Sequence, residues 1–162
     1  RGTEVDFPYN IKVAGIIVNF IDDLMHGQIQ GQKGMYRDIV HWARSGELKR
    51  LIRNLINRSF DVYIASDHGN IEVVGQGRPR NEGVLTEMTS LRTRVYQDFA
   101  VTEEVEENFK VFTYPGVYMP KNYRYIICDE DTAFGTKGQS YVCHGGMNIE
   151  EVIVPFAIIK EM

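Results

Sequence analysis

This sequence of 162 residues lacks the marks of a membrane protein and of a disulfide-stapled secreted protein. No stretch approaches the ~18 apolar residues that a transmembrane helix needs, and no signal peptide opens the chain. Its two cysteines, Cys128 and Cys143, are too few for a secreted disulfide framework. The net charge of −4 gives no overall attraction for nucleic acid, although it leaves room for local basic patches. These absences favour a cytoplasmic globular protein with no membrane partner.

The composition is that of an ordinary globular domain, with 43% hydrophobic and 25% charged residues. A chain of this length can bury roughly 70% of its unfolded surface. We therefore predict a single domain over residues 1–162. Because the first residue is Arg1 rather than Met, we interpret the chain as a piece of a larger protein.

Two apolar runs flank a helical region in the first half of the chain. Residues 11–21 are β-branched and almost wholly apolar, which is typical of a central strand buried on both faces, and residues 60–65 form a second run. Between the runs, apolar residues at helical spacing predict an amphipathic helix, namely Leu48, Leu51, Ile52, Leu55 and Ile56. Strand, helix and strand of this length predict a βαβ unit whose parallel strands end at one edge of a sheet.

Shorter signals follow in the second half. The predicted strands lie within residues 85–99 and at residues 123–128, 140–143 and 152–159. Pro155 indicates an edge strand or a bulge in the last of them, and Asn148 is a candidate N-cap for a short helix. The pattern predicts an α/β fold with a mixed, mainly parallel sheet flanked by helices.

Carboxylate and imidazole side chains follow three of the predicted strands. Asp67 and His68 come directly after one strand, Asp22 and His26 follow another at a spacing of four, and His144 follows a third. Sheets of α/β proteins build their sites at such strand ends. Asp and His are ligands of the divalent ions that catalyse phosphoryl transfer, often as two ions roughly 3.5–4 Å apart. These residues therefore predict a metal-dependent phosphoryl-transfer site.

Each candidate also has an ordinary interpretation. Asp67 and His68 open a sequence that suits a surface turn, and Asp23 competes with Asp22 for the ligand role. Residues 22–34, by contrast, are polar and carry three glycines, which predicts a loop of active-site size. Arginines that could bind phosphate oxygens, or could simply be solvated, are Arg78, Arg80, Arg92 and Arg94. Cys143 is better explained as a small buried residue than as a ligand. Ser66 and His68 lie too close in sequence to form a Ser-His-Asp triad.

At these motifs the chain resembles the alkaline phosphatase superfamily, and more closely its PglZ branch. The likeness to PglZ proteins lies in Asn19-Phe-Ile-Asp-Asp-Leu-Met-His26 and in the stretch from His144-Gly-Gly to Pro155. The stretch Ser66-Asp-His-Gly-Asn70 is also similar to cofactor-independent phosphoglycerate mutase, another member of the superfamily.

The resemblance implies a ligand set and an incomplete site. Asp22, His26 and His144 would bind one ion, and Asp67 and His68 would bind a second, with zinc or manganese as the metal. It also implies an alkaline-phosphatase-like core of which this chain is the later part. The Ser or Thr nucleophile is expected upstream of the chain, since no residue before Asp22 stands in the position that the family requires. We therefore predict that the chain is inactive by itself.

The function that the resemblance implies is hydrolysis of phosphate esters, phosphodiesters in particular, in bacterial phage defence, with nucleic acid or a nucleotide as the substrate. The partners would be other proteins of the phage growth limitation or BREX systems. One alternative is a non-catalytic scaffold that docks partner proteins of the defence complex. A second alternative is a metabolic enzyme of the phosphomutase type.

Overall fold

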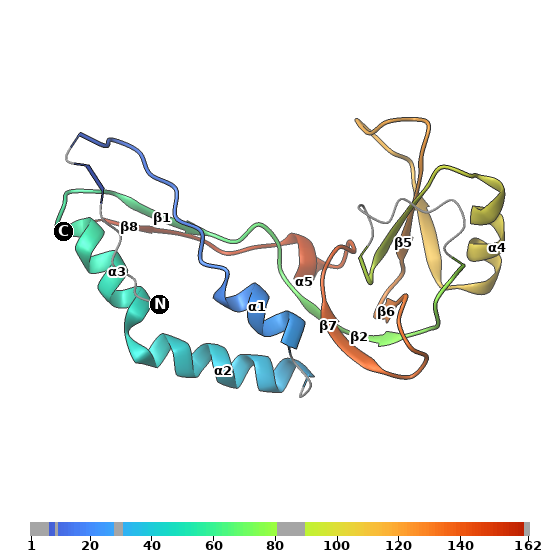
Figure 1. The fold of residues 1–162 in the computed structure, drawn as a ribbon, viewed down its shortest axis with the longest axis horizontal. Helices are drawn as coiled ribbons and strands as arrows, with labels where there is room; N and C mark the ends of the chain where they lie inside the picture. Colours follow the sequence, from blue (N-terminus) through green and yellow to red (C-terminus); the bar gives the residue numbers. More distant parts are fainter. Residues whose placement is uncertain (1–6, 9, 28–30, 81–89, 161–162) are drawn as a thin grey trace. The chain divides into compact units, whose positions relative to one another are not determined.

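The computed structural model describes residues 7–8, 10–27, 31–80 and 90–160, which divide into two compact units (Figure 1). Unit 1 combines Arg1–Ser66 with Pro155–Met162, and unit 2 is Asp67–Val154. Both units contain helices and strands, which confirms the predicted α/β class. No helix in the described part of the chain has the length and apolar character needed to cross a membrane.

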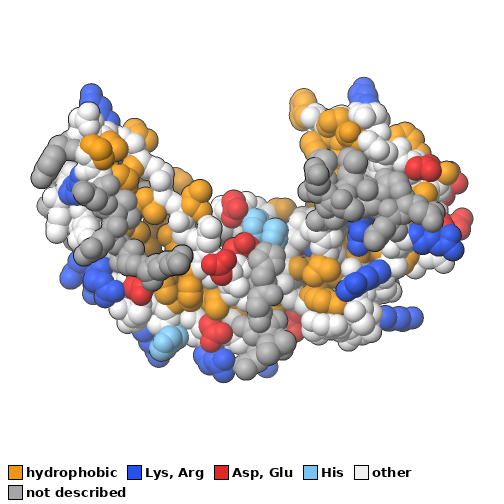
Figure 2. All heavy atoms as spheres, viewed as in Figure 1, with side chains coloured by type: hydrophobic (Ala, Val, Ile, Leu, Met, Phe, Trp, Pro, Cys, Tyr) orange, Lys and Arg blue, Asp and Glu red, His pale blue; other side chains and the backbone are white. Residues whose placement is uncertain are grey.

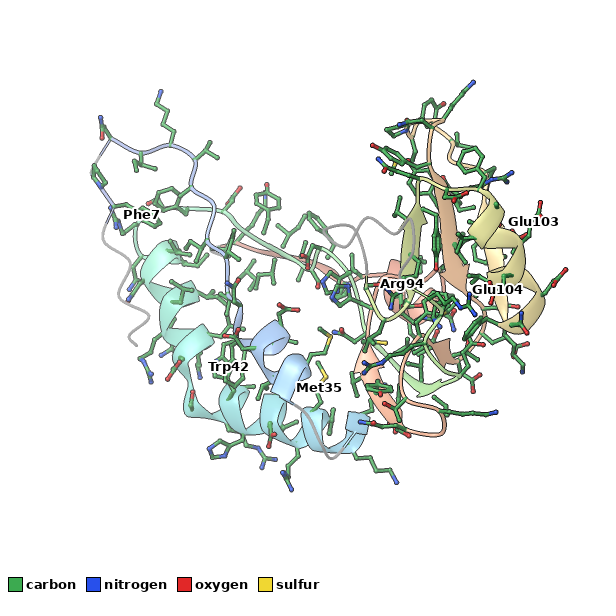
Figure 3. All side chains as sticks on the ribbon, turned by 45° about the vertical axis from the view of Figure 1, so that its right-hand side comes forward. Phe7, Met35, Trp42, Arg94, Glu103 and Glu104 are labelled. Carbon is green, nitrogen blue, oxygen red and sulfur yellow. The ribbon has the colours of Figure 1, made fainter. Side chains whose placement is uncertain are left out.

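Unit 1 consists of helices and a two-stranded sheet. Its elements are α1 (Phe20–Gly27), α2 (Gly31–Ser45), α3 (Glu47–Ile56), β1 (Val62–Ala65) and β8 (Phe156–Ile159). The predicted amphipathic helix is confirmed as α3, which packs on β1 and buries Leu51. Helices α1 and α2 meet where the Phe20 ring stacks on Trp42, which is labelled in Figure 3, at a centroid separation of 5.0 Å.

The predicted central strand over residues 11–21 is wrong. Residues 11–19 form no strand, and α1 begins at Phe20. Val13 and Ile17 are 89% and 88% exposed, and hydrophobic side chains are visible on the surface in Figure 2. A strand requires a second backbone to bond its amides and carbonyls, and no described residue supplies one to this run.

Two related predictions fail with that strand. The predicted βαβ unit is absent from the described residues, because β1 pairs with β8 in antiparallel register, Val62 opposite Ile159. The predicted loop over residues 22–34 is also wrong, since α1 continues to Gly27 and α2 begins at Gly31. The apolar side chains of Phe20, Ile21, Leu24 and Met25 recur at helical spacing, which favours α1 over a loop.

In the described residues, unit 2 contains two three-stranded sheets and two helices. Its elements are β2 (Ile71–Gly75), β3 (Thr93–Tyr96), α4 (Ala100–Asn108), β4 (Val111–Tyr114), β5 (Arg124–Cys128), β6 (Thr132–Ala133), β7 (Ser140–Cys143) and α5 (Ile149–Val152). The sheets have the strand orders β6-β2-β7 and β3-β5-β4. Strands β5 and β7 confirm two sequence predictions, whereas β2, β4 and β6 were not predicted.

The pairing of strands differs from the mainly parallel sheet expected from sequence. Among the described strands, β2 and β6 are the parallel pair. The pairs β1–β8, β2–β7, β3–β5 and β4–β5 are antiparallel. Strands β4 and β5 are consecutive, and a short connection favours antiparallel pairing because a parallel connection needs a crossover of a dozen or more residues. The partners in the other antiparallel pairs are distant in the sequence, so no local pattern indicated their direction.

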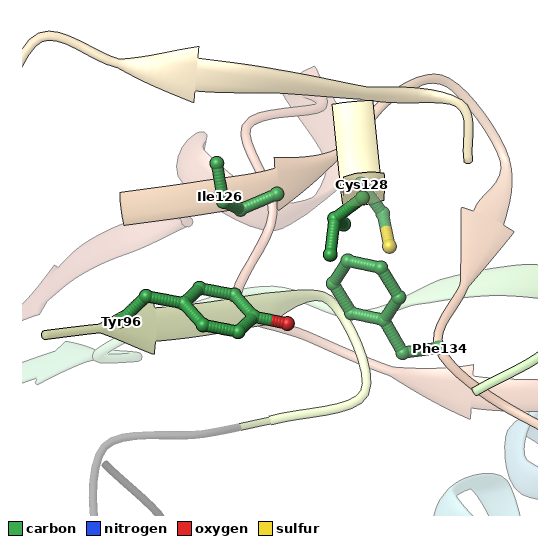
Figure 4. Packing of buried hydrophobic residues seen from close by; sticks show 5 residues of the cluster. Tyr96, Ile126, Cys128 and Phe134 are labelled. Carbon is green, nitrogen blue, oxygen red and sulfur yellow. The ribbon is translucent and has the colours of Figure 1, made fainter. Parts of the chain in front are cut away.

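The main apolar cluster of unit 2 lies between α4 and the β3-β5-β4 sheet. Its buried members are Tyr96, Val105, Ile126, Cys128 and Phe134, most of which are labelled in Figure 4. A second cluster joins Val73, Ala133 and Cys143 beneath the β6-β2-β7 sheet. These clusters hold the sheets in place, and the candidate site lies at the ends of two of their strands.

Candidate metal site

Two histidines from distant parts of the sequence meet in unit 2. Strands β2 and β7 are antiparallel neighbours with Ile71 opposite Cys143, so the start of one strand lies beside the end of the other. His68 stands three residues before Ile71, and His144 directly follows Cys143. Their rings stack with centroids 3.6 Å apart and an interplanar angle of 12°. The antiparallel register therefore brings together two of the predicted ligands.

The atoms around His68 fit a divalent ion. His68 Nδ1 lies 3.0 Å from the carbonyl oxygen of Gly69, which can only accept a hydrogen bond. This contact assigns the proton to Nδ1 and leaves Nε2 as the ligand nitrogen. Nε2 lies 3.8 Å from Asp67 Oδ1. Imidazole and carboxylate ligands of one tetrahedral zinc ion lie about 3.4 Å apart, so these two atoms would share an ion after approaching by about 0.4 Å.

The exposure of these groups also suits an accessible site. The Asp67 side chain is 88% exposed, and His68 and His144 are half-buried. Asp67 Oδ1 accepts a hydrogen bond from the His68 amide at 3.1 Å, which holds the carboxylate on the side of the imidazole. A ligand atom of His144 lies within 4.8 Å of one of His68. The donors are neutral imidazoles and a carboxylate, which is the chemistry that zinc and manganese accept.

The other predicted ligands belong to unit 1. Asp22 and His26 both lie in α1, where residues four apart share a helical face, so their spacing suits a common ion. Asp22 is exposed, as is its competitor Asp23, and the side chain of His26 lies outside the described residues. The ligand roles of Asp22 and His26 stay predictions. His41, which the ligand scheme left out, is an exposed residue of α2.

The two arginines predicted to bind phosphate lie in the irregular stretch after β2. Arg78 and Arg80 are both exposed, and they line a pocket of about 230 Å³ together with Val101 and Phe109. Arg80 Nε is 4.0 Å from a carboxylate oxygen of Glu104. Their exposure leaves them accessible to a phosphate group, and that role stays a prediction.

Comparison with known families agrees with the motifs. Residues 7–159 match the family described as BREX system PglZ alkaline phosphatase-like domain. The chain belongs to the PglZ family. Comparison with curated proteins gives no match. The match covers nearly the whole chain and confirms the resemblance inferred from sequence. It indicates a phosphatase-like hydrolase domain that works with other BREX proteins, in a family that uses divalent metal ions generally.

One prediction about the PglZ domain's arginines is wrong. Arg92 is not available to a phosphate, because its side chain is 0% exposed and forms an ion pair with Glu151 at 3.1 Å. Sequence reasoning missed Glu151. Asn148 and Glu151 form a capping box at α5, and the Asn-x-x-Glu spacing was a signal that could have identified Glu151 as part of that turn.

The thiols of the PglZ domain are structural. Cys143 is buried, which confirms its interpretation as a small core residue rather than a ligand. Burial raises the pKa of the Cys143 thiol to about 12, and burial also raises the pKa of the Cys128 thiol to about 11. The burial of both sulfurs agrees with a packing role.

Proposed function

We propose that this chain supplies metal ligands to a two-metal hydrolase of phosphate esters that acts in phage defence. Asp22, His26 and His144 would hold one ion, and Asp67 and His68 would hold the other, zinc or manganese in each case. Phosphodiesters are the favoured substrates, with nucleotides or nucleic acid as the chemical class. The Ser or Thr nucleophile is not assigned to a residue of this chain, and a cytoplasmic location is part of the proposal.

The observation that carries the proposal is the meeting of His68 and His144. Their rings stack at 3.6 Å although 76 positions separate them in the sequence. Two imidazoles beside an exposed carboxylate are the types of ligand that zinc and manganese accept. Binding of divalent ions by these groups agrees with the family to which the chain belongs.

The chain's own residues would have three tasks in this chemistry. His68 keeps its proton on Nδ1 through the Gly69 carbonyl oxygen and so presents Nε2 to an ion. Asp67 contributes negative charge 3.8 Å from that nitrogen. Arg78 and Arg80 would bind the non-bridging phosphate oxygens by charge-assisted hydrogen bonds. Two bound ions would stabilise the charge that develops on the attacking and leaving oxygens.

Hydrolysis of matched esters tests this function. The full-length protein would be given bis(p-nitrophenyl) phosphate and p-nitrophenyl phosphate with added zinc or manganese, beside a His144→Ala variant. His41→Ala is the matched control, because His41 is an exposed residue of α2 outside the ligand scheme. We expect diester turnover that metal supports, that His144→Ala abolishes and that His41→Ala leaves unchanged.

Other outcomes separate the alternatives. If the metal-loaded protein turns over neither ester, hydrolysis is excluded for these substrates and a scaffold that docks other defence proteins becomes the better account. Transfer of phosphate within a phosphorylated metabolite, without release of phosphate, would instead support the phosphomutase alternative. Preference for the monoester would retain the hydrolase and remove the diester assignment.

A further inference from the structure

Arg92 and Glu151 form an ion pair in the interior of unit 2. Arg92 Nε lies 3.2 Å from Glu151 Oε1 and Nη2 lies 3.1 Å from Oε2, so the guanidinium and carboxylate are joined by two parallel hydrogen bonds. Their side chains are 0% and 1% exposed. Replacement of such a pair by apolar residues of similar volume is often neutral or stabilising. A stabilising role therefore does not follow from the burial of the pair alone.

The Glu151 carboxylate binds the turn that carries His144. The Gly146 amide donates to Oε1 at 2.8 Å, and the Asn148 amide donates to Oε2 at 3.1 Å. A Cβ at Gly146 would lie 2.5 Å from Arg92 Nη2 and from Glu151 Oε2. The backbone of this turn thus lies directly against the ion pair, in a position that a side chain would prevent.

The main chain of Glu151 binds the segment that carries His68. The Gly69 amide donates to the Glu151 carbonyl at 2.8 Å, and a Cβ at Gly69 would lie 1.9 Å from the carbonyl oxygen of Glu150. The carbonyl of Gly69 in turn accepts from His68 Nδ1. One residue, Glu151, is therefore hydrogen-bonded to the backbone on the C-terminal side of both histidines.

Arg92 anchors this arrangement to the rest of unit 2. Its Nη2 donates to the Glu130 carbonyl at 2.8 Å and to Asn148 Oδ1 at 3.0 Å, and its Nη1 donates to the Thr132 carbonyl. The guanidinium is thereby held from several directions. Because it is rigid and planar, it fixes the plane of the Glu151 carboxylate as well.

We propose that Arg92 and Glu151 are positioning residues that set the separation and orientation of the His68 and His144 imidazoles. The inference rests on the proposed function, in which these imidazoles hold divalent ions. Glu151 acts through the backbone at Gly69 and Gly146, and Arg92 acts by holding Glu151. Groups that orient metal-binding histidines commonly contribute 10–100-fold to metal affinity.

The test measures Zn²⁺ affinity of the full-length protein by competition with a chromophoric chelator. Glu151→Gln keeps the volume but removes the charge, and Arg92→Lys keeps the charge but loses the two parallel hydrogen bonds. We expect each variant to bind Zn²⁺ roughly 10–100-fold more weakly. We also expect the absorption bands of the Co²⁺-loaded variants to shift at saturating metal, because those bands report ligand geometry.

Two comparisons make the result decisive. Val105→Ala removes buried apolar volume from the cluster around Phe134 and lowers stability, so it should leave both the affinity and the Co²⁺ spectrum unchanged. His144→Ala tests the site itself. If His144→Ala weakens binding while folded Glu151→Gln and Arg92→Lys bind like the wild type, the positioning role is overturned alone. If His144→Ala has no effect, the proposed metal site is overturned, and the positioning role with it.

Discussion

Gly145 and Ser90 are packed so closely that a Cβ at Gly145 would lie 2.7 Å from Ser90 Oγ. Gly145 also has φ +98°, in the region that L-residues rarely adopt. Ser90 Oγ cannot easily move aside, because it accepts hydrogen bonds from the amides of Arg92 and Thr93 at 3.0 Å. The residue after His144 is therefore required to be glycine for two independent reasons.

The first prediction concerns this glycine. Gly145→Ala should destabilise unit 2 by about 1–3 kcal/mol, from the positive φ and the contact with Ser90 together. Gly138→Ala is the matched control, since Gly138 has φ +79° but no atom within 4 Å of an added Cβ. Denaturant unfolding of both variants separates the two effects. Equal losses at the two positions would show that the contact with Ser90 contributes nothing.

The second prediction concerns the reactivity of Cys128. Burial raises the pKa of this thiol to about 11, whereas an unperturbed thiol has a pKa of about 8.5. At pH 8 the thiolate fraction should then be roughly 100-fold lower than in a free thiol. Reaction of the native protein with Ellman's reagent should be slow at this thiol and become rapid on unfolding. Rapid reaction in the native state would contradict the burial of Cys128.

The same raised pKa has a consequence for stability at high pH. As the pH rises past about 8.5, the unfolded state loses the Cys128 proton while the folded state keeps it. The contribution of the protonated thiol to the free energy of unfolding should therefore be complete below that pH. The free energy of unfolding should fall as the pH approaches 11. Denaturant titrations at pH 7.5 and pH 10 check the sign, and a constant free energy would contradict it.

The third prediction concerns the core beneath α4. Phe134 is 1% exposed and packs with Tyr96, Ile126 and Cys128 (Figure 4). Phe134→Ala should cost about 3–5 kcal/mol, because it removes a buried ring and leaves a cavity. Phe99→Ala is the control, since Phe99 is 41% exposed and should cost about 1 kcal/mol or less through its contact with Arg124. Thermal unfolding distinguishes them, and similar losses would be inconsistent with this core.

The fourth prediction concerns phosphate binding. If Arg78 binds a phosphate oxygen of the substrate, Arg78→Ala should raise KM by about tenfold or more, since a hydrogen bond to a charged group contributes about 1.5–3 kcal/mol. Its exposure means that stability should change little. Lys137→Ala is the control, because Lys137 is an exposed basic residue that does not line this pocket. An unchanged KM in Arg78→Ala would assign this arginine to the solvated surface.

The elements that sequence predicts well are those decided by neighbouring residues. The stripe that begins at Leu48 forms α3, residues 140–143 form β7, and Asn148 caps α5. Spacing over a few residues fixes the helix and the cap, since helical periodicity and capping act over three or four residues. The predicted strand over residues 152–159 is too long, because Val152 belongs to α5 and β8 begins at Phe156, after Pro155.

Sequence reasoning fails where an element depends on a pairing partner that is distant in the sequence. Residues 11–21 have the composition of a buried strand, yet a strand exists only where another backbone bonds to it, and residues 11–19 have no such pairing in the described structure. Strand β1 shows the same limit. Its apolar pattern was recognised, but its partner β8 lies more than 90 positions away and runs antiparallel.

The sequence predicted two histidines of the candidate site but not the strands that bring them together. The sequence placed His68 and His144 at strand ends, and the structure brings them together. It does so through the antiparallel pair β2–β7, whereas the prediction relied on parallel strands. The ion pair of Arg92 and Glu151 joins residues 59 positions apart, and no local pattern links an arginine in a strand region to a glutamate in a short helix.

The measurement that tests the account most directly is the metal content of the full-length protein. Inductively coupled plasma mass spectrometry would count the divalent ions in the wild type, in His68→Ala, in His144→Ala and in the control His41→Ala. The account predicts two ions in the wild type and in His41→Ala, and fewer in the other two variants. A wild type without metal, or unchanged metal content in His68→Ala and His144→Ala, would contradict it.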